Sequence, residues 1–179
     1  MQDNKMIIET IVTGFLEENC YVIIKGNKCL VVDPGDDYLK IKEKIGNNKV
    51  IGVLITHSHA DHIGALRHFL TSRTIKIFKK SSTQEKEYEI GDFKFKVIFT
   101  PGHSIDSISF YFEEEKIMFV GDFIFKNTIG RCDLPGGNEK QMKESLEKIK
   151  TYSDNITLYP GHGEITNLKA EKENNEFLK

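Results

Sequence analysis

Three of the six histidines in this chain fall within six positions, in the segment His57-x-His59-x-Asp61-His62. Imidazole nitrogen and carboxylate oxygen are donors that zinc, iron and manganese accept. His57 and His59, two residues apart in an extended loop, project to one side and can bind one ion together. Asp61 and His62 are displaced around the start of a helix and are better placed for a second ion. The segment therefore predicts a metal centre.

Three more candidate ligands, His103, Asp122 and His162, share one setting: each follows an apolar strand that ends in a glycine-containing loop. The local sequences are FTPGH, FVGD and YPGH. The ends of strands in one sheet system open onto one edge, and glycine lets the backbone approach closely. We therefore expect these side chains to converge on the same centre.

The elements that must position these residues can be read from hydrophobic patterning. Apolar and β-branched runs predict strands at 6–14, 20–25, 28–32, 50–55, 93–99, 107–112, 116–120 and 156–159. Helical spacing predicts helices at 38–45, 61–70, 139–150 and 168–178, and the polar stretch 79–89 is predicted to be a loop or a solvated edge. No linker divides the chain, so residues 1–179 are predicted to form one α/β (α+β) domain with two sheets flanked by helices.

The seven candidate ligands together resemble the motif of the metallo-β-lactamase superfamily, with every position filled. The resemblance implies an αββα sandwich of two mixed β-sheets flanked by helices. It also implies two divalent transition metals, zinc first, with iron or manganese as alternatives. One ion would take His57, His59 and His103, the other Asp61, His62 and His162, and Asp122 would bridge them. The catalytic carboxylates would be Asp61 and Asp122, with a bridging hydroxide as nucleophile.

Within this superfamily the chain looks most like the glyoxalase II-like hydrolases, especially the small bacterial forms. The markers are Glu18-Asn19-Cys20-Tyr21, Asp33-Pro34-Gly35, the segment GRCDLPGG at 130–137 and the end NEFL at 175–178. The resemblance implies a binuclear thioesterase that hydrolyses S-lactoylglutathione or a related acyl-thiol. Two departures are Glu164, where glyoxalase II proteins usually have a tyrosine, and the missing domain that carries their glutathione-binding basic residues.

The sequence leaves two roles open for each of two residues. In the family an acidic residue in a turn like that of Asp33 supports the metal-binding loop, although Asp33 could also be a plain turn former. Arg131 lies close to the position where glyoxalase II proteins hold a substrate carboxylate with a lysine, and its guanidinium could form a bidentate pair with such a group. It could equally be a solvated or ion-paired structural residue.

Two other classes of function stay open. Ala60 and the Gly130-Arg131-x-Asp133 stretch also resemble the persulfide dioxygenases, which bind one iron through two histidines and one aspartate. A metal-stabilised domain without catalysis is the third reading, although a structural site would be expected to close its coordination shell. His68 is predicted to be an ordinary helix residue.

Composition restricts the partners. The chain has 25 Lys and Arg against 27 Asp and Glu, so no global charge attracts nucleic acid or an anionic membrane. No apolar run approaches the roughly 20 residues that cross a bilayer, and the segment Met1–Lys5 lacks the features of a secretory signal. We therefore expect a cytoplasmic protein with a small-molecule partner. The three cysteines show no CxxC spacing, which argues against disulfides and a thiolate site.

Overall fold

The computed structural model describes residues 5–179. Residues 1–4 of the predicted domain, and with them most of the segment tested for a secretory signal, lie outside this part. Within it, no helix is long and apolar enough to span a membrane.

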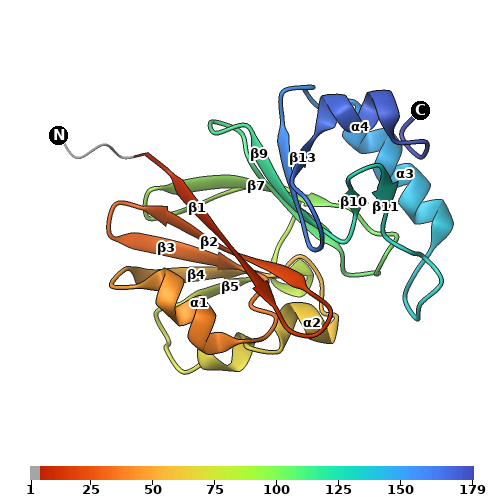
Figure 1. The fold of residues 1–179 in the computed structure, drawn as a ribbon. Helices are drawn as coiled ribbons and strands as arrows, with labels where there is room; N and C mark the ends of the chain where they lie inside the picture. The colour runs from red at the N-terminus through yellow and green to blue at the C-terminus, as the bar shows by residue number, and fades with distance from the viewer. Residues whose placement is uncertain (1–4) are drawn as a thin grey trace.

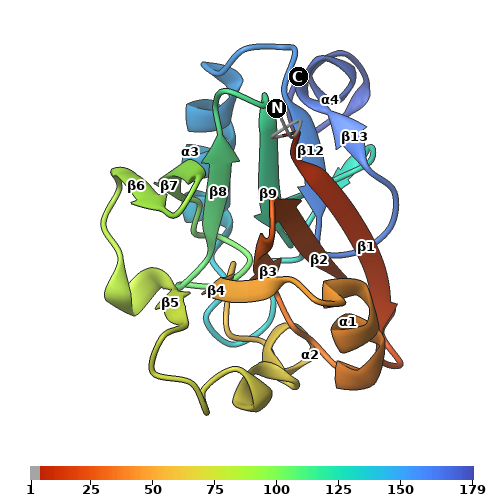
Figure 2. The ribbon, with the colours of Figure 1, turned by 90° about the vertical axis from the view of Figure 1, so that its left-hand side faces the viewer.

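Two β-sheets form the centre of the molecule (Figure 1, Figure 2). The first has five strands in the order β1 (Ile7–Thr13), β2 (Glu18–Lys25), β3 (Lys28–Val32), β4 (Lys49–Leu54) and β5 (Lys76–Phe78). The second has six, in the order β13 (Thr166–Asn167), β12 (Thr157–Pro160), β9 (Ile117–Gly121), β8 (Ile108–Phe112), β7 (Phe93–Phe99) and β6 (Glu87–Ile90). A short hairpin pairs β10 (Ile124–Phe125) with β11 (Thr128–Ile129).

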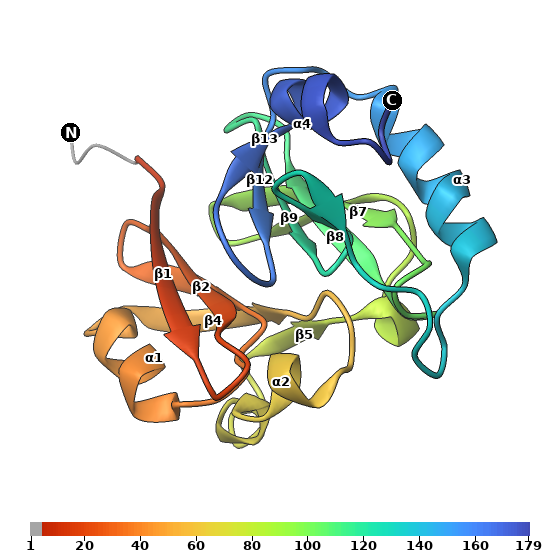
Figure 3. The ribbon, with the colours of Figure 1, turned by 45° about the vertical axis from the view of Figure 1, so that its right-hand side comes forward.

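Helices cover the outer face of each sheet (Figure 3). They are α1 (Tyr38–Ile45) and α2 (Ala60–Ile63) on the first sheet, and α3 (Glu139–Lys150) and α4 (Leu168–Asn174) on the second. An aromatic core of Phe95, Phe110 and Phe119 packs against Tyr21 and Leu30 between the sheets. Two further apolar clusters join each sheet to its helices. The predicted αββα sandwich is therefore confirmed, with both sheets mixed in strand direction.

Strand direction explains why the candidate ligands meet. In the second sheet β7 and β9 are both antiparallel to β8, and β12 is parallel to β9, so β7, β9 and β12 run the same way. Their carboxyl ends lead to His103, Asp122 and His162. In the first sheet the parallel strands β3 and β4 lead to Asp33 and to the His57 segment.

The helix predicted for 61–70 is wrong. The α-helix ends at Ile63, and a single 3-10 turn follows at Leu66–His68. The cause is the neighbouring turn, because the backbone N–H of Ala65 donates to the carbonyls of Pro34 and Gly35 at 2.9 Å each. Such an N–H cannot also continue the α-helical ladder.

Other boundaries differ at the ends of elements. The last helix stops at Asn174 instead of 178. The stretch 79–89, predicted to be a loop or a solvated edge, is largely exposed and runs into β6, the edge strand of the second sheet. Sequence patterning missed the short strands β5, β10, β11 and β13.

Candidate metal centre

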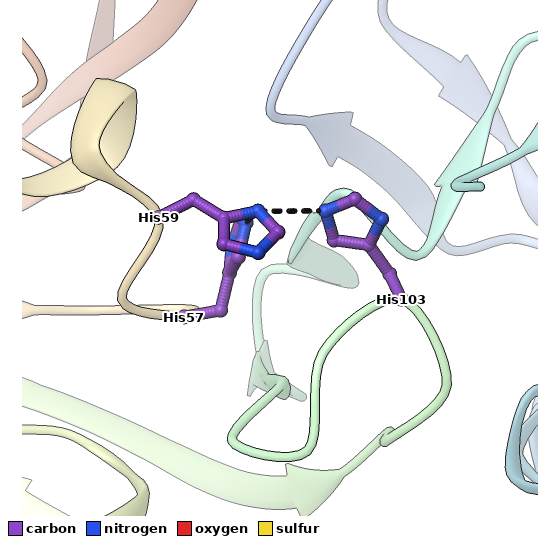
Figure 4. Close-up of side chains that lie close together, drawn as sticks. All are labelled: His57, His59 and His103. Carbon is purple, nitrogen blue, oxygen red and sulfur yellow. Dashed lines mark hydrogen bonds between the residues drawn. The ribbon is translucent and has the colours of Figure 1, made fainter. Parts of the chain in front are cut away.

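One group of donors consists of His57, His59 and His103. The first two lie in the loop after β4 and the third follows β7, and their rings point toward one another (Figure 4). The His59 Nδ1 atom lies 3.1 Å from His57 Nε2 and 3.0 Å from His103 Nε2. A proton can be shared between only two of these ring nitrogens, in an N–H···N hydrogen bond, whereas one cation can accept the lone pairs of all three. The group could hold a metal ion.

A second group consists of Asp61, His62 and His162. The Asp61 Oδ2 atom lies 3.1 Å from His162 Nε2 and 3.5 Å from His62 Nε2. The first two residues lie in α2, which follows β4 of the first sheet, and the third follows β12 of the second. This group too is therefore completed only across the two sheets.

Asp122 lies between the groups. Its Oδ2 atom is 3.5 Å from His103 Nε2 and 3.5 Å from His162 Nε2, and its Oδ1 atom is 3.3 Å from His62 Nε2. One carboxylate therefore faces donors of both groups, which is the position predicted for a bridging ligand.

Buried polar atoms support the fit to metal ions. Within residues 5–179, His62 Nε2 and Asp122 Oδ1 are buried and have no hydrogen-bond partner. A buried donor or acceptor without a partner is costly, and coordination to a cation would satisfy both atoms. Gly161 leaves room for this arrangement, because a Cβ there would lie 2.2 Å from Asp122 Oδ1 and 2.6 Å from His62 Cε1.

Hydrogen bonds on the far side of the rings orient three histidines. His62 Nδ1 donates to Asp33 Oδ2 at 2.9 Å. His103 Nδ1 donates to the Arg131 carbonyl at 2.7 Å, and His162 Nδ1 donates to the Leu16 carbonyl at 3.0 Å. When the ring is neutral, each bond leaves the lone pair on Nε2 and aimed at the centre, as outer partners of metal-bound histidines do.

Asp33 does more than form a turn, because its carboxylate binds Thr56 and His62. Its Oδ1 accepts the Thr56 backbone N–H at 2.7 Å, and its Oδ2 accepts the Thr56 hydroxyl at 2.5 Å as well as His62. Thr56 Oγ1 in turn lies 3.1 Å from His57 Nδ1. Asp33 could also be grouped with His57 and His62 as a donor, but its oxygens are taken by these bonds. The geometry is that of the support role.

Burial and neighbouring charge set the protonation of the donors. Burial, with a further effect from His62, lowers the pKa of His57 to about 2. The hydrogen bond from His162 holds the pKa of Asp61 below its usual value, although burial opposes this. Burial also opposes ionisation of Asp122, yet the nearby His62 imidazole lowers its pKa. Neutral imidazole and ionised carboxylate are the forms that bind metals.

Burial likewise disfavours the charged form of His62, but the nearby Asp122 carboxylate and the hydrogen bond to the charged Asp33 outweigh burial and raise its pKa. Two carboxylates thus compensate a positive charge at this position, which a bound cation would also provide.

Glu18, Asn19 and Tyr21, which the sequence offers only as subfamily markers, lie close to the site. Glu18 is fully buried, accepts the Thr13 hydroxyl at 2.7 Å, and places Oε1 3.8 Å from His62 Nδ1. Burial, and next the charge of Asp33, raises the pKa of Glu18 to about 9. Acidic and amide side chains inside a buried strand were the signal that could have identified them as part of the site.

The backbone carbonyl of Arg131 contacts the centre through its hydrogen bond with His103. The exposed guanidinium of Arg131 instead forms two hydrogen bonds of 2.7 Å with Asp133. It also lines a cavity of about 560 Å³ against α3, which none of the seven candidate ligands lines. The substrate role of Arg131 stays a prediction. His68 is exposed and stacks on Tyr38, outside the metal-binding groups found among the described residues.

The sequence model of the metallo-beta-lactamase superfamily matches residues 13–85 and 81–162. The chain therefore belongs to this superfamily, whose members are generally metal-dependent hydrolases. Among its relatives, a probable metallo-hydrolase YqgX of Bacillus subtilis is 31% identical, over 92% of this chain and 94% of its own. The hydroxyacylglutathione hydrolase GloC of Haemophilus influenzae is 27% identical, over 97% and 98%.

Solved structures agree with the fold. BLEG-1, described as a B3 metallo-beta-lactamase, superposes with a TM-score of 0.89 at 29% identity, covering 97% of this chain and 100% of its own. TTHA1623 in a di-iron-bound form superposes with a TM-score of 0.83 at 27% identity, covering 95% and 100%.

Proposed function

We propose that this protein is a binuclear metallohydrolase that cleaves thioesters of the glyoxalase II type, S-lactoylglutathione or a related acyl-thiol. One observation carries the proposal. The Asp122 carboxylate faces His62 and His162 of one donor group and His103 of the other, at 3.3–3.5 Å. Two sets of donors that share a carboxylate fit two neighbouring ions better than one.

When bound, two divalent ions supply an activated water and an electrophile for the acyl oxygen. Asp61 and Asp122 contribute the negative charge that holds such ions, and Gly161 keeps the space beside them open. A thiol of pKa about 8.5 leaves readily as thiolate, which reduces the need for a general acid. Thioesters therefore suit a site whose ionisable groups are largely committed to the metals.

The relatives support the proposal without fixing the substrate. GloC is named a hydroxyacylglutathione hydrolase, and TTHA1623 carries two irons, which keeps iron as an alternative to the proposed zinc. Arg131 is the proposed contact for a carboxylate of the acyl-thiol. This substrate carboxylate would have to replace Asp133 as the partner of the Arg131 guanidinium. The proposed partner is a cytoplasmic small molecule, in keeping with the near balance of acidic and basic residues.

The alternative is the persulfide dioxygenase reaction at a single iron held by two histidines and one aspartate. His103 Nε2, 3.5 Å from Asp122 Oδ2, could belong to such a site. That reading leaves the group of Asp61, His62 and His162 without a role, although these donors are equally well assembled.

One experiment separates the two reactions. Metal content and release of free thiol from a panel of acyl thioesters are measured on the same sample, beside an oxygen-electrode trace with glutathione persulfide. The proposal expects up to two metals per chain and thiol release without oxygen uptake. One iron per chain with persulfide-dependent oxygen uptake would establish the alternative. Less than one metal per chain, with no thioesterase activity after reconstitution with zinc, iron or manganese, would refute the proposed function.

A further inference from the structure

The turn that presents His162 is bound by the beginning of β2, a strand of the opposite sheet. The Asn19 backbone N–H donates to the Gly161 carbonyl at 2.7 Å. The Asn19 side-chain amide donates to the Pro160 carbonyl at 3.2 Å and the Gly163 carbonyl at 2.9 Å. These contacts join residues more than 140 positions apart in the chain.

Tyr21 adds a fourth bond to the same turn. Its hydroxyl donates to the Pro160 carbonyl at 2.6 Å, and its ring is 2% exposed. The three carbonyls of Pro160, Gly161 and Gly163 thus all accept hydrogen bonds from Asn19 or Tyr21. The next backbone contact is a bridge between Glu18 and His162 itself.

The other histidine of the second sheet is held differently. His103 donates to the Arg131 carbonyl, in the loop that follows β11. The bonds of Asn19 and Tyr21 are directed at the turn that carries His162, so they act directly on a histidine of only one of the two donor groups.

We propose that Asn19 and Tyr21 are positioning residues for the metal ion held by Asp61, His62 and His162. The inference rests on the proposed binuclear function. The two side chains fix the turn 160–163 so that His162 Nε2 faces Asp61 at 3.1 Å and Asp122 at 3.5 Å.

The turn needs such fixing because glycine lies on both sides of His162, and Gly163 has a φ of 76°. Glycine has the largest conformational freedom to lose. A turn without anchors would lose that freedom when the ion binds, and the affinity for the ion would fall accordingly. His57, His59 and His103 do not depend on this turn, so the ion they hold should be unaffected.

The test compares Tyr21→Phe and Asn19→Ala with the wild type. The matched control is Tyr159→Phe, because the Tyr159 ring packs against Tyr21 at 5.4 Å while its hydroxyl has no hydrogen bond among the described residues. Stepwise dissociation constants for zinc are measured by competition with a chromophoric chelator. His162→Ala identifies which step belongs to the second ion, and circular dichroism checks that each variant is folded.

We expect the dissociation constant of the ion held by Asp61, His62 and His162 (the second constant) to rise about tenfold in Tyr21→Phe and up to about 100-fold in Asn19→Ala. This is the range of affinity loss for mutated outer partners of metal ligands. The first constant should stay within about twofold of wild type, and Tyr159→Phe should match wild type in both. Equal weakening of both ions would mean a general structural role and would overturn the inference. Unchanged constants in both variants would also overturn it. A wild type that binds only one ion would instead refute the binuclear centre on which the inference rests.

Discussion

Asp33→Asn tests the link between the two donor groups most directly. Asparagine has nearly the same shape as aspartate and tolerates the left-handed backbone at this position, where φ is 45°. Its Oδ1 can still accept the Thr56 N–H. The amide nitrogen, however, replaces the oxygen that accepts both the Thr56 hydroxyl and His62 Nδ1.

The amide would therefore reverse two hydrogen bonds. To accept from the new N–H, His62 must move its proton from Nδ1 to Nε2, the atom that faces Asp61 and Asp122. Thr56 would likewise accept from the amide and donate its hydroxyl to His57 Nδ1, which lies 3.1 Å away. His57 must then carry its proton on Nε2 as well, so both donor groups lose an available lone pair.

The expected loss is about 10- to 100-fold in affinity for each of the two ions, equivalent to about 1.4–2.7 kcal/mol per ion. The metal-free protein should lose about 1–3 kcal/mol of unfolding free energy, because one buried charged acceptor is replaced by a neutral group. Asn19→Ala, in contrast, should weaken one ion only.

The assay is chelator competition for metal affinity, together with urea unfolding of the metal-free protein. Asp36→Asn is the matched control, since Asp36 is exposed and accepts only the neighbouring Asp37 N–H among the described contacts. If Asp33→Asn binds both ions as tightly as Asp36→Asn, the tautomer argument is refuted.

Three other substitutions and the removal of metal have defined outcomes. Asp122→Ala should weaken both ions, whereas Arg131→Ala should raise KM and largely spare metal content; equal metal loss in the two variants, by elemental analysis, would contradict this division. Gly161→Ala should expel most of the bound metal, because its Cβ would lie 2.2 Å from Asp122 Oδ1, and a wild-type metal content would speak against such close packing. Removal of the metals by EDTA should lower the free energy of unfolding by about 2.7 kcal/mol for each ion whose free concentration was 100 times its Kd. For a chain of this size, that loss lowers Tm by about 5–10 °C per ion. Added zinc should restore the melting curve, and a Tm insensitive to EDTA would be inconsistent with metals that stabilise the fold.

The local sequence pattern was sufficient to predict a ligand where the ligand lies in the loop directly after an apolar strand. The run 50–55 and the endings FTPGH, FVGD and YPGH predicted strands that lead to His57, His103, Asp122 and His162, and the structure brings these side chains together. Helix 139–150 was predicted with its observed bounds, since its apolar positions Met142, Leu146 and Ile149 follow a helical period.

Long-range contacts account for what pattern could not predict. The helix expected through residue 70 is interrupted because Ala65 bonds to the turn that follows β3, a partner that helical spacing does not reveal. Asn19 and Tyr21 reach the His162 turn across most of the chain. Strands of two or three residues, such as β5 and β13, are shorter than the window in which alternation can be recognised.

The chain order of the sheets has a further consequence for folding. All five strands of the first sheet precede residue 79 and all six of the second follow residue 86. The early half supplies His57, His59, Asp61 and His62, while the late half supplies His103, Asp122 and His162. Neither half alone contains all members of either proposed ion site, that of His57, His59 and His103 or that of Asp61, His62 and His162. These two sites can therefore arise only once the halves have docked. Metal uptake would thus report completion of tertiary assembly rather than formation of either sheet.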